Sequence, residues 1–84
     1  MNKYYIARHD IYQQAKEVLY HKKKTSDAVQ ELVIKYPKLN PRSLAGYYIP
    51  ILEYLINGRT FKGNISLDFW TYYIKKIQEE FHST

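Results

Sequence analysis

Apolar side chains recur at intervals of three and four residues along most of this chain, which is the spacing of one face of an α-helix. The pattern is clearest near the C-terminus, at Trp70, Tyr73, Ile74, Ile77 and Phe81. Alternation of apolar and polar residues, which would indicate β-strands, is weak. The spacing therefore predicts an all-α fold, because a helix with one apolar face must bury that face against other helices.

Residues that favour helix ends divide the first half of the chain into two predicted helices. The first covers residues 5–23, and the lysines at its end suit the negative pole of the helix dipole. The second begins at a cap within residues 25–27 and ends before Pro37, because the residue before a proline avoids the α-helical conformation.

A third helix is predicted to start at Asn40-Pro41, where asparagine suits the cap and proline suits the first helical position. It runs to about residue 57, because Gly58 is a typical residue just beyond a helix end. Pro50 interrupts it, since proline has no N–H and its ring collides with the preceding turn. Either a kink at Pro50 or a break into two helices near Ile49 satisfies this constraint.

The fourth helix is predicted to begin with Ser66 as its cap and to end near residue 81. Trp70, Tyr73, Ile77 and Phe81 share one face of it and are interpreted as core residues. The sequence thus predicts one compact four-helix domain over residues 1–84, with the second and third helices as a helix-turn-helix-like central pair.

Composition restricts the function classes. The 84 residues include no cysteine, which excludes disulfides and cysteine-bound zinc. Aromatic residues make up 17% of the chain, and their large side chains help a small core reach stability. No segment is long and apolar enough to span a membrane, and no signal-peptide pattern is present, so we expect an intracellular protein.

Residue patterns that carry catalysis are absent from the sequence. His9, His21 and His82 have no metal-ligand partner at a useful spacing. No glycine-rich phosphate loop, serine-nucleophile motif or carboxylate cluster occurs. We therefore expect no catalysis by this chain alone, and no cofactor or metal.

Positive charge is concentrated in the middle of the chain. The net charge is +5, and residues 20–62 contain eight basic and three acidic side chains. Such a cluster is typical of a surface that binds a polyanion such as DNA. The alternative is a solvated surface that keeps a small protein soluble.

The second helix, a short turn and the third helix resemble a helix-turn-helix, whose second helix places its first residues in the major groove of DNA. We expect Arg42, Ser43 and Tyr47 to approach bases, because arginine pairs well with the edge of guanine. Asn40 bonds adenine or phosphate under this hypothesis. The candidate phosphate contacts are Lys22, Lys23, Lys24, Lys38, Arg59 and Lys62.

Each of these candidates has a purely structural alternative. Asn40 is equally explained as the cap of its own helix, and Arg42 as a solvated cation. The three consecutive lysines are also a helix end matched to the dipole. Tyr47 with Tyr48 is also explained as a surface tyrosine beside a core tyrosine.

Three segments resemble a known family. Residues 39–48 are similar to an Asn-x-x-Ser-Ala-x-x-Tyr segment, residues 55–62 resemble Leu-x-Asn-Gly-x-x-Tyr-x, and residues 65–77 resemble Ile-Asn followed by Tyr-Tyr-Leu-x-x-Ile. In this order they resemble the small helical N-terminal domain of bacterial HNH-type endonucleases of the restriction kind. The chain departs from that pattern at Pro50 and at Gly63-Asn64, and no HNH residues follow.

The resemblance implies a double-stranded DNA-recognition domain, with a nuclease module as a further partner, in the cytoplasm of a bacterium or a phage-infected cell. It implies binding without hydrolysis by this chain. A different class of function is a small protein-interaction module, such as a phage-type inhibitor or a dimerisation domain. The aromatic surplus favours that alternative, because tyrosine and tryptophan are enriched at interfaces.

Overall fold

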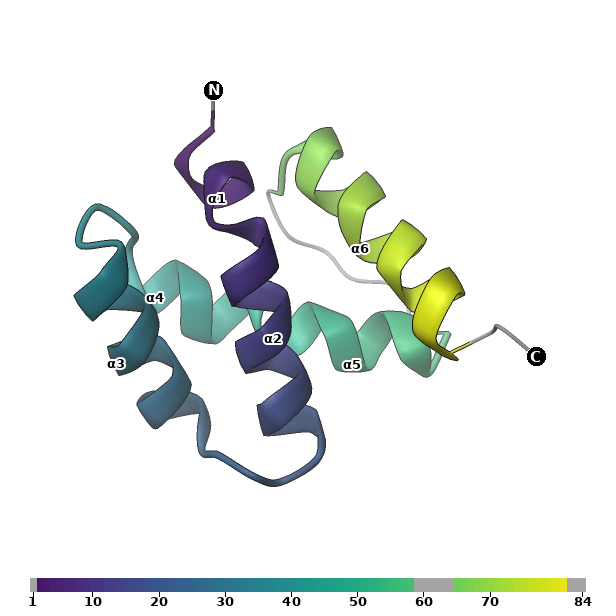
Figure 1. The fold of residues 1–84 in the computed structure, drawn as a ribbon, viewed down its shortest axis with the longest axis horizontal. Coiled ribbons are helices and arrows are strands. Elements are labelled where there is room, and N and C mark those ends of the chain that lie inside the picture. Colours follow the sequence, from purple (N-terminus) through teal and green to yellow (C-terminus); the bar gives the residue numbers. More distant parts are fainter. Residues whose placement is uncertain (1, 59–64, 82–84) are drawn as a thin grey trace.

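The computed structural model describes residues 2–58 and 65–81, and within these ranges it contains helices and no strand. The helices are α1 (Lys3–Ile6), α2 (Arg8–Leu19), α3 (Thr25–Lys35), α4 (Pro41–Ser43), α5 (Pro50–Ile56) and α6 (Leu67–Phe81), with a π-helical turn over Leu44–Tyr48. Helix α3 packs against α2, the line from α4 to α5 crosses both, and α6 packs against α5 and α2 (Figure 1). The predicted all-α fold is confirmed.

The first predicted helix is two helices in the structure. The backbone leaves the helical region at Ala7, where φ is −89° and ψ is 8°, and α2 follows immediately. Helix α1 begins at Asn2, whose side-chain Oδ1 accepts a hydrogen bond of 2.8 Å from the Tyr4 N–H. This asparagine cap explains why the helical segment starts earlier than the apolar spacing indicates.

The end of α2 also differs from the prediction. The N–H of Lys22 donates to the Glu17 carbonyl at 2.9 Å and the N–H of His21 to the Val18 carbonyl at 3.0 Å, which is a Schellman motif. His21 takes the left-handed position of that motif, with φ at 60°. The lysines therefore follow the helix rather than completing it, and the predicted end at residue 23 is wrong.

The cap of α3 lies one residue before the predicted range 25–27. Lys24 holds the cap position with an extended backbone and no side-chain cap bond, so Thr25, Ser26 and Asp27 lie in the first turn. The helix ends at Lys35, before Pro37, as predicted.

The π-helical turn accommodates Pro50. The Ile49 N–H donates to the Leu44 carbonyl, five residues back, at 3.0 Å. This wider turn stands directly before the proline, which has no N–H of its own to donate. The segment is divided near Ile49 into the π-helical turn and α5, although Ile49 keeps helical dihedrals, with φ −79° and ψ −49°. The segment ends as predicted, with Gly58 at a φ of 69°.

Five of the described aromatic residues are buried in the core: Tyr4, Tyr12, Tyr48, Phe69 and Tyr73. The Tyr4 and Tyr48 rings stack with centroids 4.2 Å apart, and Phe69 meets Tyr48 edge-on at 4.7 Å. Phe69 also lies 4.8 Å from Tyr73, whose ring meets Tyr12 at 5.4 Å. The Tyr73 hydroxyl donates to the Tyr48 carbonyl at 2.9 Å, which fixes α6 to the π-helical turn.

Helix α6 buries part of the predicted face. Tyr73 and Ile77 are buried as expected, whereas Trp70 and Phe81 are half-buried at the edge of the core. Phe69, which was not predicted, is fully buried. Ser66 stands directly before α6, as predicted for its cap, and its carbonyl accepts the Trp70 N–H at 3.1 Å. Its buried hydroxyl makes no hydrogen bond with the described residues, so the predicted side-chain cap is not formed. Within the described ranges, no helix has both the length and the apolar character needed to cross a membrane.

Candidate nucleic-acid interface

The predicted DNA-contacting residues in the described part of the chain lie on and around α3, the turn after it and α4. Asn40 stands at the junction, where its Oδ1 accepts hydrogen bonds from the N–H groups of Arg42 at 2.8 Å and Ser43 at 3.4 Å. Its backbone N–H donates to the Tyr4 hydroxyl at 3.1 Å. The side chain of Asn40 is therefore used to cap its own helix, as the structural alternative describes.

Arg42 and Lys38 lie at this junction with their side chains exposed. Neither forms an ion pair with any residue of the described ranges. Arg42 borders an open groove of about 670 Å³ between α3 and α4, whose lining includes Ser26 and Ala45 and contains no carboxylate. A polyanion that approaches this groove meets positive charge without a neutralising partner.

Tyr47 and Tyr48 divide between surface and core. Tyr47 on the π-helical turn is 42% exposed, whereas Tyr48 is buried against Tyr4 and Phe69. Ser43, one turn before Tyr47, is half-buried. Only Tyr47 of the pair has surface to offer a ligand.

The three consecutive lysines have different environments. Lys23 forms ion pairs with Glu17 at 3.2 Å and with Glu31, and it donates to Gln14 Oε1 at 2.8 Å. The bond to Glu31 raises the pKa of Lys23. Lys23 thus joins α2 to α3, while Lys22 and Lys24 are exposed and have no ion pair among the described residues.

Two further candidates, Arg59 and Lys62, lie outside the described residues. Two cations that sequence reasoning did not select lie near Lys38: Lys3 of α1 and Lys35 at the end of α3. The bond from Asn40 to Tyr4 spans 36 positions of sequence and brings α1 to this turn. No local signal in the sequence marks such a contact.

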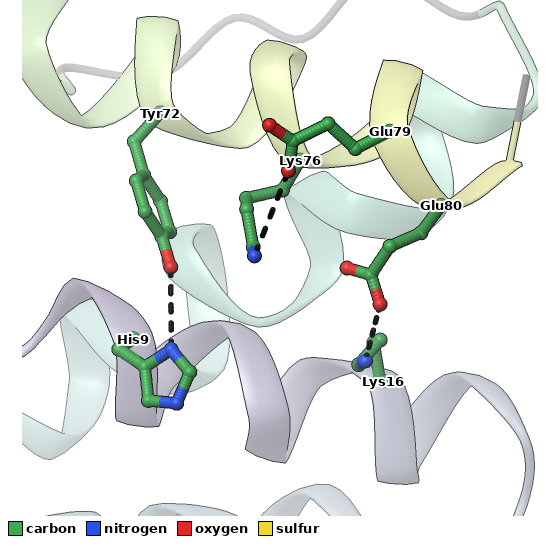
Figure 2. Close-up of polar contacts among 6 residues, drawn as sticks. All are labelled: His9, Lys16, Tyr72, Lys76, Glu79 and Glu80. Carbon is green, nitrogen blue, oxygen red and sulfur yellow. Dashed lines mark hydrogen bonds and ion pairs between the residues drawn. The ribbon is translucent and has the colours of Figure 1, made fainter. Parts of the chain in front are cut away.

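On the side between α2 and α6, several charged side chains are paired with one another. Figure 2 shows Lys16 reaching Glu80 across the two helices at 2.8 Å, and Lys76 with Glu79 at 3.8 Å within α6. Tyr72 Oη lies 3.4 Å from His9 Nδ1 in the same view. The bond to Lys16 lowers the pKa of Glu80.

Arg8, on the same side, is held by aromatic rings. Its guanidinium lies 4.1 Å from the Tyr5 ring centre and 5.3 Å from that of Tyr72, and it donates to the Tyr5 carbonyl at 2.9 Å. These interactions fix the position of the Arg8 guanidinium. No cluster of three metal-ligating side chains occurs in residues 2–58 and 65–81.

Comparison of the chain with protein-family models, curated proteins and solved structures finds no match. The resemblance to endonuclease N-terminal domains therefore stays a prediction from the sequence.

Proposed function

We propose that the chain binds double-stranded DNA through the face formed by α3, the following turn and α4. The observation that carries the proposal is the pair Lys38 and Arg42: both are exposed, and neither has an ion-pair partner in the described part of the chain. Their charge is available to phosphate, whereas that of Lys16 and Lys23 is used inside the fold.

The spacing of the cations suits a duplex. Lys22 and Lys24 precede α3 and Lys38 follows it, so unpaired positive charge stands at both ends of this helix. Eleven helical residues extend about 16 Å, which is comparable to the major-groove width of about 12 Å. Lysines at both ends can therefore meet phosphates on the two sides of a groove.

Arg42 is the proposed base-reading residue, because its planar fork matches the acceptors of guanine. Tyr47, five residues further along, is 42% exposed and is the aromatic residue of the proposed interface. Asn40 orients this part of the helix by capping it, rather than by contacting DNA itself. This assignment uses the helix-turn-helix arrangement that the sequence predicts.

The resemblance to restriction-type endonucleases supports a more specific form of the proposal. In it, the chain is a target-recognition domain, hydrolysis belongs to a separate nuclease module, and the complex acts in the cytoplasm. This form rests on the sequence segments and not on the geometry of the face.

The test is a fluorescence-anisotropy titration of the folded protein with a mixed-sequence duplex at two salt concentrations. Wild-type affinity should fall steeply with salt, by about 0.9 log units per log unit of salt for each phosphate contacted. The double variant Lys38→Ala/Arg42→Ala should bind more weakly and show a flatter dependence on salt.

The matched control is Lys75→Ala/Lys76→Ala, which removes the same charge from α6. It should keep the wild-type slope, because the proposal assigns no phosphate contact to α6. Equal weakening in both double variants would show that the effect comes from net charge alone. No binding at low salt would refute the proposal.

A further inference from the structure

A second surface, beside the α3–α4 face, combines apolar side chains with positive charge. A groove of about 330 Å³ lies between α1 and the turn after α3. Ile6, Tyr36 and Leu39 contribute its apolar lining, and Lys3, Lys35 and Lys38 its cations. No carboxylate is among the lining residues.

The groove is held in shape by hydrogen bonds from both of its sides. The Tyr36 hydroxyl donates to Asp10 at 2.5 Å, and the Leu39 N–H donates to the Tyr36 carbonyl at 3.1 Å. The bond of 3.1 Å from Asn40 to Tyr4 connects the turn to α1. A preformed groove loses little conformational freedom on binding, which favours affinity for a short ligand.

Part of the apolar lining is accessible to solvent. Ile6 is 57% exposed although it lies on a helix whose neighbour Tyr4 is buried. An isolated exposed isoleucine is ordinary, but here the side chain lines a groove together with Tyr36 and Leu39. A ligand that covers Ile6 removes apolar surface from water, which is favourable.

The charges select the ligand. Lys3 and Lys38 have no ion pair among the described residues, and Lys35, paired with Asp10 at 3.1 Å, is still 64% exposed. We propose that this groove binds a short acidic peptide segment of a partner protein, with a bulky apolar side chain set against Ile6 and carboxylates at the lysines.

Two other occupants fit less well. DNA would use the lysines but gains most of its affinity from phosphate contacts, so the apolar lining would contribute little. A second copy of the chain carries a net charge of +5 and would bring like charges together at the lysines. An acidic apolar peptide uses both features of the groove.

The experiment titrates the ¹⁵N-labelled protein with an end-blocked synthetic peptide, Asp-Glu-Leu-Phe-Glu-Asp, and follows amide chemical shifts. The comparison peptide is Asp-Glu-Ser-Ser-Glu-Asp, which has the same charge and no apolar side chain. Saturable shifts around Ile6, Tyr36 and Leu39 with the first peptide, and much weaker binding of the second, are expected.

Matched variants locate the site. Ile6→Gln keeps the net charge and should weaken the first peptide roughly tenfold. Leu67→Gln is the control, because Leu67 is 77% exposed on α6, away from the groove. Lys38→Gln should weaken the binding of the first peptide a few-fold, and this loss of affinity should be smaller at higher salt.

Several outcomes would overturn the proposal. They are no saturable shifts, equal binding of both peptides, equal weakening by Ile6→Gln and Leu67→Gln, and a concentration-dependent dimer that occupies the groove. Duplex DNA that shifts the Ile6 amide where the peptide does not would assign the groove to nucleic acid. Ile6→Gln should leave the salt slope of DNA binding unchanged, so the two proposals fail separately.

Discussion

The α2–α6 side and the α3–α4 face of this small protein use positive charge in opposite ways. Between α2 and α6, Lys16 pairs with Glu80 and Arg8 stacks on tyrosine rings. On the α3–α4 face, Lys38 and Arg42 project into solvent without a carboxylate partner in the described residues. The two regions carry the same residue types and differ in what surrounds them.

The difference teaches that a count of basic residues does not define a binding surface. Lys23 belongs to a run of three lysines, yet it is only 18% exposed and is held by Glu17 and Glu31. Its neighbours Lys22 and Lys24 are exposed. A charge already neutralised inside the fold has less to offer a polyanion, so the partners of each lysine decide its role.

The largest effect is expected from Phe69→Ala on the α6 side. Phe69 is fully buried between Tyr48 and Tyr73, so truncation removes aromatic contacts and leaves a cavity. The free energy of unfolding in urea should fall by about 3–5 kcal/mol. Leu67→Ala, at an exposed position of the same helix, should change it by no more than about 0.5 kcal/mol. Similar losses in both variants would show that α6 is not anchored through Phe69.

A smaller gain is expected from His21→Gly, in the loop that carries Lys22 and Lys24. His21 has a φ of 60°, a conformation that glycine adopts freely and other residues adopt at a cost. The free energy of unfolding should rise by about 1 kcal/mol, measured by urea denaturation.

The control His21→Ala removes the imidazole but keeps a side chain in the left-handed conformation. It should bring no such gain, and an equal gain in both variants would assign the effect to the imidazole instead. DNA affinity should stay unchanged in His21→Gly, which separates the strain of the loop from the charge beside it.

The smallest expected effect is a loss of stability in acid. It involves Asp10, which lies where α2 meets the end of α3. The hydrogen bond from Tyr36, followed by the pairing with Lys35, lowers the pKa of Asp10 from its ordinary 3.8. A lowered pKa means that the folded protein binds this proton less readily than the unfolded chain. The contribution of Asp10 to stability is therefore complete above the ordinary value and is lost as pH falls through the lower folded pKa.

Thermal unfolding measured from about pH 2 to about pH 6 tests this effect, because that range includes the ordinary pKa values of carboxyl groups. Asp10→Asn should be less stable than wild type at the upper end and should approach it at the lower end. A constant difference between Asp10→Asn and wild type across the range would contradict the linkage to this carboxylate.

The helical class and several of the helix ends can be predicted from local patterns in the sequence. Apolar spacing located α6, and Pro37, Asn40-Pro41 and Gly58 marked ends that the structure keeps. These features are local, because a missing N–H, a side-chain cap and a left-handed residue act on their own turn of backbone. Local rules do not require knowledge of the neighbours in space.

The packing of the helices, and the question of which charged side chains find partners, depend on contacts in the tertiary structure. The burial of Phe69 in place of Trp70 depends on how α6 meets the crossing helix. The bond from Asn40 to Tyr4 joins residues 36 positions apart in sequence, and Lys23 pairs with Glu31 on the following helix. Such contacts form because separate apolar faces are buried together, and the polar groups brought near one another then find partners that no local pattern specifies.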